Sequence, residues 1–135
     1  MPPEFRIFKP EYALELLRIA ESDLDSANVL FQAKKGRLEN VLFHAEQVVE
    51  KSLKAVLCHQ GKPVPLTHQL FVVISQFPTE DLPPGGFALN DLTPFATIRR
   101  YEEGKAVLGR EEVTQALNLV LKVLSWAKDK ISEKH

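Results

Sequence analysis

The segment RLENVLFHAEQVVEKSLKAVLCHQ, residues 37–60, decides the fold. Its apolar side chains recur at steps of three and four residues, which is the spacing of an amphipathic helix. The residues of this broad stripe are Leu38, Val41, Leu42, Ala45, Val48, Val49, Ser52, Leu53 and Val56. On the same helix Glu50 and Lys54 form a favourable i,i+4 pair, and Gln47 and Lys51 share the outer side. Gly61 ends the helix.

A second amphipathic helix is predicted before this segment, over residues 10–34. Pro10 suits a first helical turn. The apolar stripe consists of Ala13, Leu17, Ala20, Leu24, Ala27 and Phe31. KKG, residues 34–36, ends the helix with positive charge and a glycine. Because so few residues join the two helices, we expect them to pack antiparallel.

The chain after Gly61 predicts a connector and a short helix. GKPVPL is extended, since residues before proline avoid helical geometry. Thr67 is a candidate N-cap for a helix of about three turns over THQLFVVISQF. The run LFVVI could also be a buried strand, but we favour a helix because no partner strand is evident. PTEDLPPGG then predicts a loop.

Two further helices are predicted in the last third of the chain. One runs from Thr93, with Pro94 at its first position, to Gly104. The other begins near Gly109 and carries two apolar stripes, so it is either the centre of the bundle or a face for another subunit. The residues of these stripes are Val113, Leu117, Val120, Leu124, Ala127 and Ile131, then Leu119, Val123 and Trp126. The sequence predicts one all-α domain over residues 1–135, with a core at about 10–131. Its architecture is an up-and-down four-helix bundle with one additional short helix.

Composition limits the function classes. The chain has 135 residues, 44% hydrophobic and 26% charged, with a formal net charge of -1, so no global charge draws it to nucleic acid or membrane. The single cysteine, Cys58, cannot form an internal disulfide, which fits a reducing cytoplasm. The charged, proline-containing N-terminus is unlike a signal peptide, and no run is long enough to span a bilayer. We therefore expect a cytoplasmic protein.

The most unusual local segment is ATIRRYEEGK, residues 96–105. Arg99, Arg100, Tyr101 and Glu102 stand at the end of the predicted fourth helix, where cations suit the helix dipole. The same residue types can clamp a phosphate and stack on a base. Both interpretations stay open from the residues alone.

Two other residues are candidates for binding. Lys51 either covers apolar surface with its stem or contacts a phosphate or a partner. His68 either helps to satisfy the backbone at a helix start or has a functional role. No phosphate-binding glycine loop, HExxH motif or nucleophile elbow is present, and the histidines lack metal-ligand spacing. We predict no catalytic residue, no metal site and no cofactor.

Three segments together resemble the HEPN domain (higher eukaryotes and prokaryotes nucleotide-binding), in its nucleotidyltransferase-associated branch. They are DLDSANVLF, then FHAEQVVEKSLKAVLCHQGKPVPLTHQL, then RRY near the end of a late helix. The matching positions of the second segment are Gln47, Glu50, Lys51, Lys54, Ala55, Pro65, Thr67, His68 and Leu70. The resemblance spans residues 12–131.

The resemblance implies an α-helical bundle, a homodimer, and a separate minimal nucleotidyltransferase chain as partner, often in a toxin–antitoxin system. Many family members are metal-independent ribonucleases that use an arginine and a histidine with four to six residues between them. Here those positions hold Gly104, Lys105, Ala106 and Val107, so the histidine is missing. Arg100–Tyr101 matches the arginine–tyrosine step of the branch, but Glu102 replaces the proline that often follows.

Three functions follow from these observations. The first, which we favour, is a non-catalytic subunit that binds a nucleotide or a partner through Arg99, Arg100, Tyr101, Glu102, Lys51 and His68. The second is a metal-independent RNA-cleaving toxin with a non-standard active site. The third is a structural dimer held by the broad apolar face of the last helix.

Overall fold

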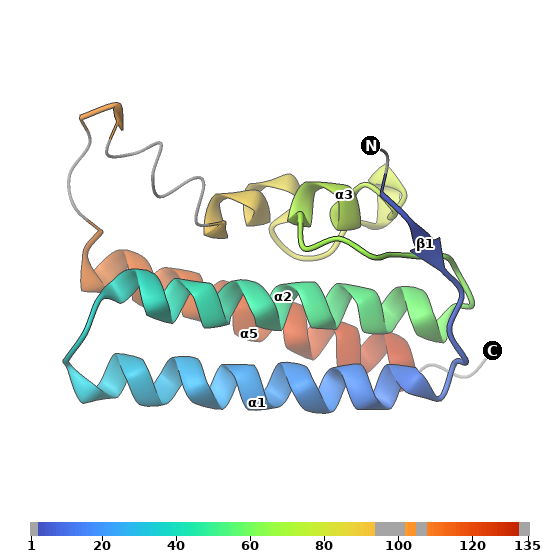
Figure 1. Ribbon diagram of the computed structural model, residues 1–135, viewed down its shortest axis with the longest axis horizontal. Helices are drawn as coiled ribbons and strands as arrows, with labels where there is room; N and C mark the ends of the chain where they lie inside the picture. The colour runs from blue at the N-terminus through green and yellow to red at the C-terminus, as the bar shows by residue number, and fades with distance from the viewer. Residues whose placement is uncertain (1–2, 94–101, 105–107, 133–135) are drawn as a thin grey trace.

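The computed structural model describes residues 3–93, 102–104 and 108–132. Within these residues, three long helices run alongside one another (Figure 1). They are α1 (Tyr12–Ala33), α2 (Leu38–His59) and α5 (Arg110–Ser132). Their bounds lie close to the predicted ones, and the all-α helical bundle is confirmed.

The turn between α1 and α2 makes the two helices antiparallel, as predicted. Lys34 ends α1 with a φ of 57°, and Gly36 follows with a φ of 80°. Backbone with positive φ reverses the chain tightly at a helix end. The helices then pack along their length, with Ala20, Ala27 and Ala45 fully buried.

Helix α2 is the centre of the molecule. Four consecutive residues near its end, Ala55, Val56, Leu57 and Cys58, are 0% exposed, so the helix is covered on every side there. Helices α1 and α5 lie against it, and the segment that contains α3 covers its remaining face (Figure 1). The centre of the bundle was one of two positions predicted for the last helix. In the structure α2 occupies the centre instead.

The layer over α2 consists of short elements. They are helix α3 (Leu70–Ile74) and the 3-10 helices η1 (Thr79–Asp81) and η2 (Gly86–Leu92). The helical alternative for LFVVI is therefore correct, but α3 is shorter than predicted. Thr67 is not its N-cap: Gln69 precedes the helix in an extended conformation and donates its N–H to Thr67 Oγ1 at 3.2 Å.

A short antiparallel ladder fastens the N-terminal segment to the connector. Strand β1 (Phe5–Arg6) pairs with β2 (Val64–Pro65), so that Phe5 opposes Pro65 and Arg6 opposes Val64. Leu66 extends the contact by donating its N–H to the Glu4 carbonyl at 2.7 Å. The connector GKPVPL is therefore extended, as predicted, and it pairs with the segment that precedes α1.

The second apolar stripe of α5 is covered within the chain. The ring of Trp126 meets the ring of Phe77 edge-on at 5.6 Å between centroids, and Val123 is fully buried. The side chain of Leu119 lies directly over Gly85. Residues of the same chain therefore cover part of this apolar face.

The predicted fourth helix, residues 93–104, falls mostly outside the described residues. Arg99, Arg100 and Tyr101 are among those not described, whereas Glu102 is described and exposed. No helix in the described ranges is long and apolar enough to cross a membrane. In the same ranges, no group of His, Cys, Asp and Glu side chains is arranged to hold a metal ion.

Candidate functional site

The polar centre of the molecule is Glu50, whose side chain is 0% exposed in the middle of α2. An ionised carboxylate at such a position requires compensating charges and hydrogen-bond donors. Lys54, one turn further along α2, donates from Nζ to Glu50 Oε2 at 3.1 Å. Lys51 donates to the same oxygen, also at 3.1 Å. The pair predicted between Glu50 and Lys54 is therefore present, but it is buried.

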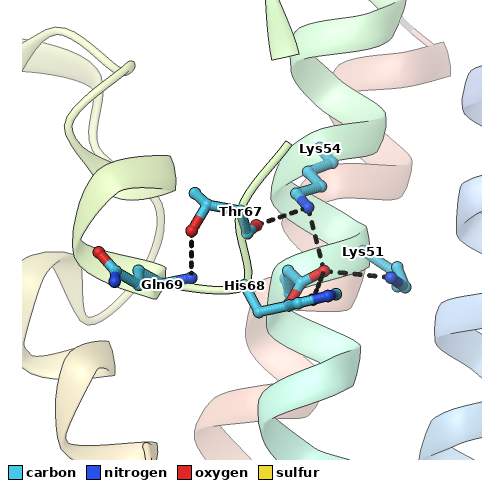
Figure 2. A network of polar contacts seen from close by, with 6 residues as sticks. Lys51, Lys54, Thr67, His68 and Gln69 are labelled. Carbon is cyan, nitrogen blue, oxygen red and sulfur yellow. Dashed lines mark hydrogen bonds and ion pairs between the residues drawn. The ribbon is translucent and has the colours of Figure 1, made fainter. Parts of the chain in front are cut away.

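The connector between β2 and α3 supplies the other contacts. His68 Nδ1 lies 3.0 Å from Glu50 Oε1 and 3.2 Å from Oε2. Lys54 also donates to the carbonyl oxygen of Thr67 at 2.8 Å. Figure 2 shows Lys51, Lys54 and His68 converging from the helix and from the connector. The cluster thus fastens the start of the α3 layer to the centre of α2.

The charges around Glu50 determine whether its carboxyl group is ionised. Burial raises the pKa of Glu50, but the ammonium groups of Lys54 and Lys51 and the hydrogen bonds of His68 and Lys51 outweigh burial, so the pKa lies below its ordinary value. An ionised carboxylate only accepts hydrogen bonds. His68 Nδ1 therefore carries a hydrogen and donates a hydrogen bond to the Glu50 carboxylate. The other ring nitrogen, Nε2, belongs to a side chain that is 78% exposed and is open to a ligand.

Glu46 lies one turn before Glu50 on α2 and has the opposite character. It is 6% exposed, and no hydrogen bond or ion pair joins it to any of the described residues. Burial, followed by the neighbouring charge of Glu50, raises the pKa of Glu46 from 4.5 to about 7. The pKa of Asp23 on α1 is also raised, by burial first, although His44 and Lys51 oppose the shift. The carboxyl groups of Asp23 and Glu46 therefore resist ionisation, whereas the carboxyl group of Glu50 favours it.

The structure brings together two of the predicted site residues. Lys51 and His68 are far apart in the chain, but both contact Glu50. His68 makes its hydrogen bond to the side chain of Glu50 on α2, and not to the backbone at the start of a helix. Glu102 is exposed, and Arg99, Arg100 and Tyr101 lie outside the described residues, so their relation to this cluster stays a prediction.

The central role of Glu50 was not predicted from the sequence. The i,i+4 spacing of Glu50 and Lys54 identified a pair on α2, but surface pairs have the same spacing. The signal that could have identified a buried pair is the position of Glu50 among apolar residues, directly after Val48 and Val49. Such a position demands partners, and the lysines at 51 and 54 provide them.

Comparisons with known proteins address the family and the fold. The family model described as HEPN domain matches residues 13–131, most of the chain. Among solved structures, the crystal structure of TT1696 from Thermus thermophilus is similar, with a TM-score of 0.68 and 23% sequence identity. The alignment covers 88% of this chain and 98% of that one, which supports the same fold. No curated protein matches the chain significantly in sequence.

Proposed function

The chain belongs to the HEPN domain family, and on that premise we propose that it is a non-catalytic subunit that binds a nucleotide and a partner chain. Membership of the family supports a nucleotide-binding or RNA-related role, and HEPN domains often form dimers. The finer proposal is a homodimer that pairs with a separately made minimal nucleotidyltransferase, in a toxin–antitoxin arrangement.

One observation carries the choice of a binding role over a nuclease role. With four to six residues between the arginine and the histidine, the candidate positions after Arg99 and Arg100 hold Gly104, Lys105, Ala106 and Val107, so no histidine stands at this spacing. Histidine is the side chain whose unperturbed pKa suits proton transfer near neutral pH. Arginine and tyrosine retain the ability to bind a phosphate and to stack on a base. We propose Arg100 and Tyr101 as the main contacts, with Arg99 and Glu102 beside them.

Nucleotide binding is tested by thermal unfolding with and without ATP or GTP. A ligand at about 100 times its Kd stabilises the folded state by about 2.7 kcal/mol, which raises the Tm by several degrees. We expect this rise for the natural chain and its loss in Arg100→Ala. Arg37→Ala is the matched control, because Arg37 is an exposed arginine paired only with nearby Glu39 in the described structure. If neither nucleotide raises the Tm at millimolar concentration, nucleotide binding is wrong.

One structural observation favours a second candidate, metal-independent RNA cleavage. Glu50 fixes His68 through Nδ1 and leaves Nε2 exposed, an arrangement in which a carboxylate orients a histidine for proton transfer. An RNA-cleavage assay in a metal chelator, comparing the natural chain with Arg100→Ala and His68→Gln, separates the candidates. We expect no cleavage by any of them. Cleavage by the natural chain that both variants lose would establish the nuclease instead.

A further inference from the structure

An exposed pair of phenylalanine rings lies on the layer that covers α2. Phe71 of α3 is 58% exposed and Phe87 of η2 is 42% exposed, and their ring centroids are 5.6 Å apart with a tilt of 43°. We call Phe71 and Phe87 the ring pair. Exposed apolar side chains that lie together, rather than singly, are a feature of surfaces that bind ligands or partners.

The backbone beneath the ring pair is firmly held. In α3, Leu70, Val73 and Ile74 are 0% exposed, and they anchor the element from which Phe71 projects. In η2, Leu89 is 0% exposed and anchors the element from which Phe87 projects. The rings therefore stand on elements fixed by the core, so little conformational freedom is lost when a flat ligand stacks on them.

A polar group of matching chemistry stands close by. His68 precedes Phe71 by three residues, so the two Cα atoms are at most about 11 Å apart. The Glu50 carboxylate holds His68 Nδ1 at 3.0 Å, although the histidine side chain is 78% exposed. The Nζ atom of Lys51 contacts the same carboxylate (Figure 2). When the imidazole is protonated, Nε2–H is an outward donor, and Lys51 adds positive charge beside it.

We propose that the ring pair, His68 and Lys51 form a binding subsite for a nucleoside phosphate unit. The base stacks on the ring pair, and the phosphate accepts a hydrogen bond from His68 Nε2 and lies near Lys51. Stacking on aromatic rings beside cationic groups is the usual way in which proteins bind single-stranded nucleic acid. The inference rests on the proposed nucleotide-binding function and adds a second contact region to it, separate in sequence from Arg99–Glu102.

The subsite is tested by fluorescence anisotropy with a labelled short oligoadenylate, and by competition with unlabelled AMP. We expect Phe71→Ala and Phe87→Ala each to weaken binding of the oligoadenylate by about fivefold or more, since stacking on one ring contributes about 1–3 kcal/mol. His68→Gln should weaken it several-fold. The matched control is Phe43→Ala, because Phe43 is 49% exposed on α2 and lies outside the ring pair. Competition by AMP assigns the subsite to a free nucleotide, and binding of the oligoadenylate alone assigns it to single-stranded RNA.

Other outcomes overturn the subsite. Should Arg100→Ala abolish binding while both phenylalanine variants bind as well as the natural chain, the subsite is wrong and the proposed function stands. Absence of binding by the natural chain removes both. A dimer that dissociates in Phe71→Ala, with binding unchanged, would make the ring pair an interface between copies. Phe71→Leu and Phe87→Leu, which keep an apolar side chain but lack the flat ring, must also weaken binding, and they replace any alanine variant that fails to fold.

Discussion

At the scale of single residues, two glutamates one turn apart on α2 show how environment sets protonation. Glu50 is fully buried and ionised, because Lys51, Lys54 and His68 contact it. Glu46 is nearly as buried, and its pKa rises to about 7. The same side chain therefore stabilises the fold at one position and opposes it at the other.

Replacing Glu46 should stabilise the protein at alkaline pH. Below pH 4.5 the carboxyl is protonated in both the folded and the unfolded chain, so it has no effect on stability. As the pH rises towards 7, the unfolded chain ionises first and the folded chain loses stability; a shift from 4.5 to about 7 corresponds to about 3 kcal/mol. We expect Glu46→Gln to recover up to about 3 kcal/mol above pH 7 and almost nothing below pH 4.5. Urea unfolding across this range measures it, and a gain independent of pH would contradict the assignment.

Replacing Glu50 should have the opposite effect. In Glu50→Gln, the buried ammonium of Lys54 loses its anion, and breaking a buried pair in this way destabilises by about 3 kcal/mol or more. The native contribution is present at neutral pH and is lost as the pH falls through the lowered pKa of Glu50. Glu15→Gln is the control, because Glu15 pairs with the exposed Arg18 and such pairs contribute about 1 kcal/mol or less. Equal losses in the two variants, measured by urea unfolding, would show that the cluster is not a buried ion pair.

The sequence identified individual members of this cluster but not their meeting point. Lys51 and His68 were candidates because of their residue types and their place in the family pattern. Their common contact with Glu50 depends on the path of the connector over α2, which helical periodicity does not specify. The exposed ring pair was missed for a similar reason, since apolar residues in LFVVI and GGFALN suggest burial and only the packing shows which of them face outward.

At the scale of elements, the long helices were predictable and the layer over α2 was not. The stripes of α1 and α2 repeat over many turns, so periodicity locates both helices within about two residues. The element α3 has only five residues, and its start depends on contacts from other elements. Lys54 donates to the Thr67 carbonyl at 2.8 Å, a hydrogen bond between residues thirteen positions apart. A local capping rule cannot anticipate such a contact.

The packing of this layer on α5 predicts an effect at Gly85. Gly85 has a φ of 86°, and a Cβ atom there would lie 3.1 Å from a methyl carbon of Leu119. Gly85→Ala should therefore combine backbone strain of about 1–2 kcal/mol with crowding of about 1 kcal/mol. Gly36→Ala is the matched control, because Gly36 has a φ of 80° and no atom lies within 4 Å of its added Cβ. Thermal unfolding should show the larger loss for Gly85→Ala, and equal losses would contradict the contact with α5.

At the scale of the whole molecule, the bundle was predictable, but its centre was not. The breadth of the apolar face on α5 suggested either a central helix or a subunit interface. In the structure Phe77 and the layer near Gly85 cover part of that face, and α2 is the central helix. This observation reduces the need for a purely structural dimer through α5. A dimer related to nucleotide or partner binding remains part of the proposal.

Capture of the chain from an extract of its native host, with quantitative mass spectrometry, tests most directly the claim that it is a binding subunit. We expect a tagged copy to recover a minimal nucleotidyltransferase chain in a stoichiometric ratio, together with the untagged chain as dimer partner. Arg37→Ala should recover the same proteins, and Arg100→Ala should recover less of the nucleotidyltransferase. Recovery of the untagged chain without any nucleotidyltransferase would contradict the proposed role as a binding subunit.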